Sequence, residues 1–142
     1  MSRPQLHLVR SRTDLVVAAY DALSRHDLDA FIATILDPGV VSAGIEAGER
    51  VGVAAVAQAH RRLHAGFPDL AYSVDGLIEA ADHTVAQVSA RGTHDGAWGS
   101  RPATGRTVHI PFCDVCTWDG RRVVRLHRYW DRQATLQQLG MA

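Results

Sequence analysis

Apolar residues in the first part of the chain recur every three or four positions, which is the period of an amphipathic helix. Ser11 or Thr13 can cap a first helix, whose apolar face consists of Leu15, Val16, Ala19, Tyr20 and Leu23. Asp27 is suited to cap a second helix, which we expect to end before Pro38 because proline disfavours helical geometry in the preceding residue. A third, alanine-rich helix is predicted at about residues 53–64.

The apolar period changes to two after Leu70, and this alternation predicts strands. Four strands are expected, at about residues 71–79, 84–93, 107–118 and 122–131. Tight turns at Ala81-Asp82-His83 and Asp119-Gly120 make successive strands antiparallel neighbours. A short helix at 135–139 follows. Helices followed by an antiparallel meander indicate the α+β class, with the helices packed on one face of a curved sheet.

Composition narrows the class of protein. A chain of 142 residues with 46% hydrophobic residues is long enough for one sizeable core, so we expect a single domain over residues 1–142. Its 15 basic and 15 acidic residues cancel, which argues against nucleic acid or a membrane surface as a partner. Every basic residue is arginine, so Schiff-base chemistry on lysine is excluded. The first twelve residues lack the apolar run of a signal peptide, and we expect a cytoplasmic protein.

The two cysteines superficially form a C-x-x-C motif. Cys113 and Cys116 lie within a predicted strand, where residues three apart point to opposite faces of the sheet. A zinc site would also need a second ligand pair, and the chain has no other C-x-x-C. We therefore expect no metal site.

The last two predicted strands each place one charge on an otherwise apolar face. Asp114 shares its parity with Val108, Ile110, Phe112, Cys116 and Trp118, and Arg128 shares its parity with Val124, Leu126 and Trp130. Because hairpin neighbours share a face, both charges are expected to point into the same interior. An unpaired buried charge is costly, so the two either form an ion pair that only fixes the strand register or line a ligand cavity.

The opposite parity of the same strands forms the outer face of the sheet. It contains Pro111, Cys113, Val115, Val123 and Tyr129, which is too apolar for a sheet face left in water. His127 lies on this parity as well and suits a subunit contact. We therefore predict a homodimer joined sheet to sheet.

Several segments of the second half carry a resemblance to a known family. They are Phe67-Pro68-Asp69-Leu70, Gly92-Thr93-His94-Asp95-Gly96, Pro102-Ala103-Thr104-Gly105-Arg106, Asp119-Gly120, and Tyr129-Trp130-Asp131 continuing to Gly140. In this order and spacing the chain resembles the SnoaL-like polyketide cyclases of the nuclear-transport-factor-two-like superfamily, over nearly its whole length. The resemblance implies a cone-shaped α+β barrel with a deep apolar pocket.

The resemblance also shows where this chain departs from the ring-closing members. Those cyclases use an aspartate in the final strand and a histidine in the preceding strand for intramolecular aldol condensation. The matching positions here are Arg128 and Asp114. Arginine cannot abstract a proton, because its pKa lies above about 12.

A branch of the same family resembles this pattern more closely. Its members are proposed hydroxylases of anthracyclines that work without a bound flavin or metal. In these proteins a partner reductase is thought to reduce the aromatic substrate to a hydroquinone, which then reacts with molecular oxygen. We expect this chain to be such a cofactor-free hydroxylase in antibiotic biosynthesis, with Arg128 stabilising an oxyanion and Asp114 orienting Arg128 or acting as a base. A cyclase with Asp114 as base, a non-catalytic binder of small apolar ligands and, fourth, an epoxide hydrolase are the alternatives.

Other residues are candidates for contact with an aromatic substrate. His94 can bond a ligand at the pocket mouth or only stabilise its own turn, and Trp98 can stack on a planar ligand as a lid or pack in the core. The remaining candidates, which can equally be core residues, are Phe112, Leu126, Trp130, Tyr20 and Phe31.

Overall fold

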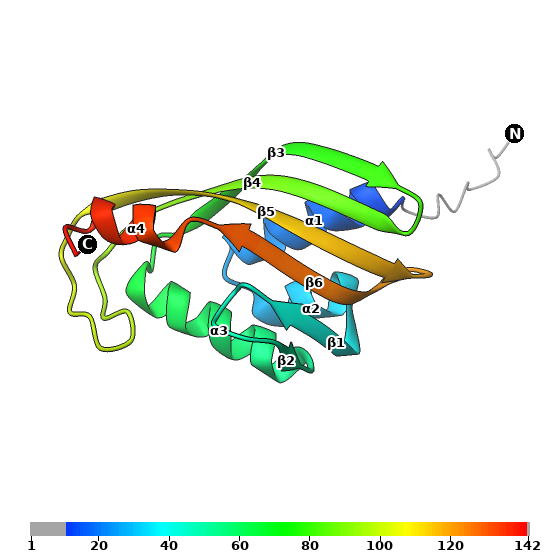
Figure 1. The fold of residues 1–142 in the computed structure, drawn as a ribbon, viewed down its shortest axis with the longest axis horizontal. Coiled ribbons are helices and arrows are strands. Elements are labelled where there is room, and N and C mark those ends of the chain that lie inside the picture. The colour runs from blue at the N-terminus through cyan, green and yellow to red at the C-terminus, as the bar shows by residue number, and fades with distance from the viewer. Residues whose placement is uncertain (1–10, 142) are drawn as a thin grey trace, which may run out of the picture.

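Four helices and six strands make up the part of the chain that the computed structural model describes, residues 11–141 (Figure 1). The helices are α1 (Arg12–Ser24), α2 (Leu28–Ile35), α3 (Val53–Gly66) and α4 (Arg132–Gln138). The strands are β1 (Leu36–Ala43), β2 (Arg50–Val51), β3 (Ala71–Ala80), β4 (His83–Thr93), β5 (Thr107–Asp119) and β6 (Arg122–Trp130). None of these helices is both long and apolar enough to cross a bilayer.

The helix starts follow the capping residues. The Ser11 hydroxyl accepts a hydrogen bond from the Asp14 amide at 3.1 Å, and the Asp27 carboxylate accepts one from the Ala30 amide at 3.0 Å. These bonds satisfy amide groups that have no partner within the first turn of a helix. Both predicted starts are confirmed, with Ser11 as the cap of α1. The predicted apolar face of that helix is buried as expected.

Strands β1 and β2 are not among the predicted elements. The second helix ends at Ile35, and the chain then continues as a strand through Pro38 and Gly39. Pairing of β1 with β6 is irregular between Leu36 and Val41, and a proline is tolerated in a strand at such an irregularity. Because β1 runs parallel to β6, the prediction of an entirely antiparallel sheet is wrong at this pair.

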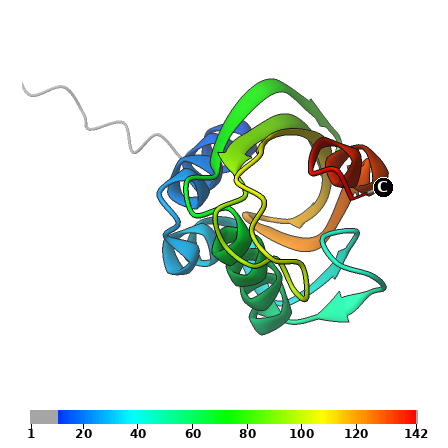
Figure 2. The ribbon, with the colours of Figure 1, turned by 90° about the vertical axis from the view of Figure 1, so that its left-hand side faces the viewer.

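The six strands form one sheet in the order β2-β1-β6-β5-β4-β3. The sheet is strongly curved and unclosed, with α1, α2 and α3 on its concave side (Figure 2). The core lies between these two layers, and its largest fully buried side chains include Phe31, Phe67, Leu23 and Leu126. The predicted α+β class and the packing of the helices on one face of a curved sheet are confirmed.

The register of β5 and β6 decides which side chains point inward. Asp114 lies opposite Arg128, and Phe112 lies opposite Trp130, as the parity argument requires. The pairing shifts by one residue between Thr117 and Trp118, which places Val123 inside the core with 0% exposure. The assignment of Val123 to the outer face and of Val124 to the inner face is therefore wrong, because a bulge reverses the alternation beyond it.

Candidate functional site

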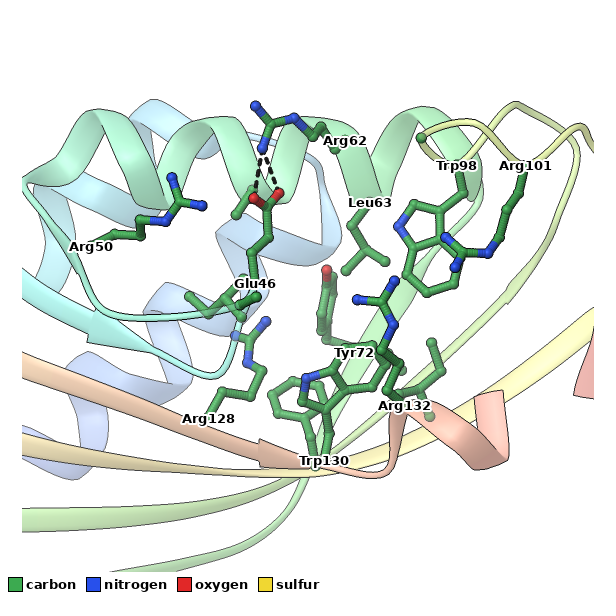
Figure 3. A pocket seen from close by; sticks show the side chains of 17 residues that line it. Glu46, Arg50, Arg62, Leu63, Tyr72, Trp98, Arg101, Arg128, Trp130 and Arg132 are labelled. Carbon is green, nitrogen blue, oxygen red and sulfur yellow. Dashed lines mark hydrogen bonds and ion pairs between the residues drawn. The ribbon is translucent and has the colours of Figure 1, made fainter. Parts of the chain in front are cut away.

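A cavity of about 290 Å³ lies at the end of the cone where the loops meet. Its walls come from the β1–β2 loop, α3, the concave faces of β3 to β6, the β4–β5 loop and the start of α4 (Figure 3). This volume is at the lower end of the range found for small-molecule sites, roughly 300–1,000 Å³. The lining combines aromatic and aliphatic side chains with five arginines and one glutamate.

Arg128 contributes a buried cation to this lining. Its Nε donates to Asp114 Oδ1 at 2.8 Å, and its Nη2 donates to Asp114 Oδ2 at 3.0 Å. The Arg128 side chain is 5% exposed and the Asp114 side chain is fully buried. Burial alone would lower the pKa of Arg128, but the Asp114 carboxylate outweighs burial and the pKa is raised. The two charges therefore form an ion pair, and of the two only Arg128 also lines the cavity.

Both oxygens of Asp114 are already occupied. Besides the two bonds from Arg128, Oδ2 accepts a hydrogen bond from the hydroxyl of Tyr20 in α1. Burial, and then the nearby Asp114 charge, raise the pKa of Tyr20, so that hydroxyl stays protonated and donates. Asp114 thus holds the guanidinium in place from behind the cavity wall.

His60 completes the surroundings of Arg128. Its Nδ1 contacts the Val56 carbonyl oxygen at 2.8 Å, and its Nε2 lies 3.3 Å from Arg128 Nη1. Burial, followed by the Arg128 charge, lowers the pKa of His60, so the ring is neutral and Nε2 can accept. A guanidinium has five N–H donors, of which these contacts use three. No other residue of 11–141 accepts a bond from Arg128, so two donors remain for a ligand oxygen.

Tyr72 provides a second polar group in the cavity wall. Its hydroxyl lies 2.7 Å from Nε2 of His64, whose ring stacks on that of His26 at 3.9 Å between centroids. His64 and His26 also line a hollow on the outside of the protein. Burial, and then the neighbouring His26, lower the pKa of His64 to about 4, while burial raises the pKa of Tyr72. The neutral histidine can accept a hydrogen bond from the protonated phenol, which fixes the Tyr72 hydroxyl in the cavity wall.

Aromatic rings form the other walls. The rings of Trp98 and Trp130 are tilted by 45° to each other with centroids 6.5 Å apart, and the Arg128 guanidinium carbon lies 4.3 Å from the centroid of Phe112. The Trp130 indole donates to the Gly44 carbonyl at 2.6 Å, which fixes its orientation. These surfaces suit a flat, apolar ligand.

Four more arginines line the outer part of the cavity. Arg62 contacts Glu46 through Nη1 at 2.6 Å and 2.7 Å, as the dashed lines of Figure 3 show. The guanidinium carbons of Arg101 and Arg132 lie 5.4 Å and 5.5 Å from the centroid of Trp98. Arg50 is the fourth.

The structure places the predicted site residues in two groups. Arg128, Trp98, Phe112 and Trp130 line the cavity. The others lie behind its wall or away from it: Asp114, Tyr20, Phe31, Leu126 and His94.

Of the two roles considered for His94, its contacts fit the stabilisation of its own turn. It is completely buried, it stacks on Phe67 at 5.1 Å, and its Nδ1 contacts the Thr104 hydroxyl at 3.0 Å. Its backbone carbonyl accepts bonds from the amides of Thr104 and Gly105. These contacts organise the β4–β5 loop that carries Trp98 and Arg101.

The predicted site residues do not include Tyr72, His60, His64 or the outer arginines. The spacing of His60 and His64 is a usable signal, since residues four apart share a face of a helix. Within residues 11–141, no three His, Cys, Asp or Glu side chains lie close enough together to hold a metal ion. Cys113 and Cys116 are free, and only Cys116 is buried.

Solved structures with the same cone-shaped fold are similar to nearly the whole chain. AclR from Streptomyces galilaeus, for which a hydroxylase activity is proposed, is 22% identical with a TM-score of 0.82, over 92% of this chain and 82% of that one. IdmH from Streptomyces antibioticus, a proposed polyketide cyclase, is 21% identical with a TM-score of 0.80, over 92% and 99%. TsrD from Streptomyces laurentii is 21% identical with a TM-score of 0.83, over 96% and 100%.

These likenesses confirm the fold. No curated protein matches the sequence significantly. The family model described as SnoaL-like polyketide cyclase matches residues 14–139. The chain belongs to the SnoaL-like polyketide cyclase family.

Proposed function

We propose that this protein hydroxylates a reduced, anthracycline-type aromatic polyketide in antibiotic biosynthesis, with molecular oxygen as co-substrate and without a bound cofactor. The observation that carries the proposal is the position of Arg128, which presents two unused donors to a cavity with aromatic walls. A fixed guanidinium in a water-poor site is a strong stabiliser of negative charge on oxygen.

The reaction balances with oxygen and the reduced substrate alone. A hydroquinone adds O₂ at a ring carbon to give a hydroperoxide, which loses water and leaves a hydroxylated quinone. The two electrons come from the hydroquinone, which a separate quinone or flavin reductase has to supply. Arg128 stabilises the phenolate form of the hydroquinone, and the extra negative charge makes the ring a better electron donor to O₂.

Asp114 acts in this proposal as a positioning residue. Its carboxylate does not line the cavity, and both of its oxygens are engaged by Arg128 and Tyr20. The one carboxylate in the lining is Glu46, which is paired with Arg62. A reaction that needs electrostatic stabilisation therefore fits this cavity better than one that needs a carboxylate base.

Ring closure of an open polyketide is the second candidate, and the contact between Tyr72 and His64 favours it. A neutral imidazole bonded to a phenol in the cavity wall can relay a proton from the carbon acid, while Arg128 stabilises the enolate. This route uses no carboxylate base.

Mass spectrometry of an anthracycline-type quinone incubated with the protein, a chemical reductant and air tests the proposal, with an anaerobic control. The expected product is heavier by one oxygen atom and does not form without air. The matched variant is the double substitution Arg128→Gln with Asp114→Asn, which removes both charges without leaving one unpaired. Full turnover by this folded variant would refute the role of Arg128. Anaerobic ring closure of an open polyketide ester that is lost in Tyr72→Phe would establish the cyclase instead.

The proposed enzyme is cytoplasmic and works as a homodimer joined through the outer face of the sheet. Tyr129 on that face is 54% exposed and stacks on His127 at 4.0 Å, next to the half-buried Cys113 and Val115. Light scattering after size exclusion should give twice the chain mass, and Tyr129→Arg should give the monomer. A monomeric wild-type protein would contradict the dimer.

A further inference from the structure

We propose that the cavity binds its aromatic ligand as an ionised acid, with the ligand carboxylate held at the cavity mouth between Arg101 and Arg132. The inference rests on the proposed function, because it specifies the substrate class of the same site. It separates aromatic polyketide acids, which bear a free carboxylate, from the corresponding esters.

The first observation is the convergence of two cations on one ring. The Arg101 and Arg132 guanidinium carbons lie within about 5.5 Å of the centroid of the same Trp98 indole, although they come from the β4–β5 loop and the first residue of α4. Both guanidinium groups therefore lie beside the same indole. An anion at this indole is attracted by both charges.

The second observation is that these two arginines have no acidic partner. Of the other arginines that line the cavity, Arg128 is paired with Asp114 and Arg62 with Glu46. Arg50 forms no ion pair with a carboxylate of residues 11–141 either. Within residues 11–141, no carboxylate forms an ion pair with Arg101 or Arg132. Their hydrogen-bond donors are therefore available, and a guanidinium matches a carboxylate in shape and charge.

The third observation is their position relative to the inner part of the site. Arg128 is 5% exposed, whereas Arg132 is exposed and Arg101 is half-buried. Figure 3 shows Arg128 on one side of Trp130, and Trp98, Arg101 and Arg132 together on the other. A flat ligand that packs on Trp98 and Trp130 can thus place one oxygen at Arg128 while its carboxylate reaches the mouth.

Binding of anthraquinone-2-carboxylate and of its methyl ester tests the inference, measured by isothermal titration calorimetry at pH 7.5. The wild-type protein should bind the acid at least about tenfold more tightly than the ester, and this preference should shrink as salt is added. In the double variant Arg101→Gln with Arg132→Gln, the ratio should fall to about one while the affinity for the ester stays the same. An unchanged ester affinity also shows that the aromatic walls are intact.

Arg61→Gln is the matched control. Arg61 lies on α3 and lines the hollow on the outside of the protein instead of the cavity, so its removal should leave the acid-to-ester ratio unchanged. The measurement needs no turnover, so its failure is distinct from failure of the hydroxylation assay.

Four outcomes would overturn the inference. They are equal affinities of the wild-type protein for acid and ester, a preference that persists in the double variant, an equal loss of preference in Arg61→Gln, and binding of neither probe. A further result would also show that the inference is wrong. If acid and ester bind equally, but Arg101 and Arg132 are required for binding an acidic carrier protein that bears the polyketide, the two arginines form a protein-docking site.

Discussion

Asp114→Asn isolates the energetic role of the buried ion pair. The substitution keeps the size of the side chain but removes the charge that faces a guanidinium with 5% exposure. Asparagine retains one oxygen, so Arg128 loses one of its two bonds to this side chain. Tyr20 also loses its acceptor if that oxygen takes the Oδ1 position. Removing one partner of a buried pair costs about 3–5 kcal/mol, and we expect roughly 3 kcal/mol because one acceptor remains.

That cost is a large share of the stability of a domain, which is typically about 5–15 kcal/mol. At this chain length 1 kcal/mol corresponds to a change in Tm of about 4 °C, so the variant should melt about 12 °C lower than the wild-type protein. Urea unfolding followed by circular dichroism gives the free energy of unfolding, and calorimetry gives the Tm.

The decisive comparison is with the double variant Asp114→Leu with Arg128→Met. Replacing both charges by apolar side chains leaves no unpaired charge, and only the neutral Tyr20 hydroxyl and His60 ring lose a partner. An unpaired neutral group costs less than an unpaired buried charge. The double variant should therefore be more stable than Asp114→Asn. A loss below about 1 kcal/mol in Asp114→Asn, or a double variant less stable than the single one, would refute the reasoning.

Three further outcomes follow from the surroundings of the cavity. Folding lowers the pKa of His64 from 6.5 to about 4, so the unfolded chain binds a proton at a higher pH than the folded protein does. The free energy of unfolding should therefore fall by roughly 2 kcal/mol as the pH drops from 6.5 to 4, after allowance for solvent screening. Urea unfolding of His64→Gln should show a smaller fall over the same pH range. Gly66→Ala places a methyl group 2.8 Å from Trp98 Cβ, so it should displace the indole and weaken anthraquinone binding by about tenfold, seen as a change in tryptophan fluorescence. Thr104→Val removes the hydroxyl that contacts His94 and should cost about 1–2 kcal/mol of stability, measured by urea unfolding; an unchanged free energy of unfolding would contradict the assignment of His94 to the loop.

Much of the sheet could be predicted because the pairing of a hairpin depends on residues that are close together in the sequence. Alternation along residues 107–131 placed Asp114 and Arg128 opposite each other, and the turn at Asp119-Gly120 fixed their hairpin. The same rule failed at Val123, because a bulge adds one residue to one strand and nothing in the apolar pattern marks it. Strand β1 was missed because Pro38 resembles a helix stop, and the pairing of β1 depends on β6, which lies far away in the sequence.

The site could be predicted only in its inner part. Phe112, Arg128 and Trp130 share a strand face, and a period of two finds them. The contact between Tyr72 and His64 joins a strand to a helix, and Arg101 and Arg132 meet at Trp98 from separate segments. Contacts of this kind arise from the curvature of the sheet, which no local pattern encodes.

The chain of polar contacts from Tyr20 through Asp114 and Arg128 to His60 has a consequence for how the protein folds. Its bonds join residues 94, 14 and 68 positions apart, and they connect α1, β5, β6 and α3. Such distant partners meet only after the loops between them have closed, so the chain of contacts is completed late in folding. A partly folded molecule that already has its hairpins still lacks an oriented Arg128. The capacity to bind an aromatic ligand should therefore appear together with the final cooperative step, and a misassembled molecule should bind none.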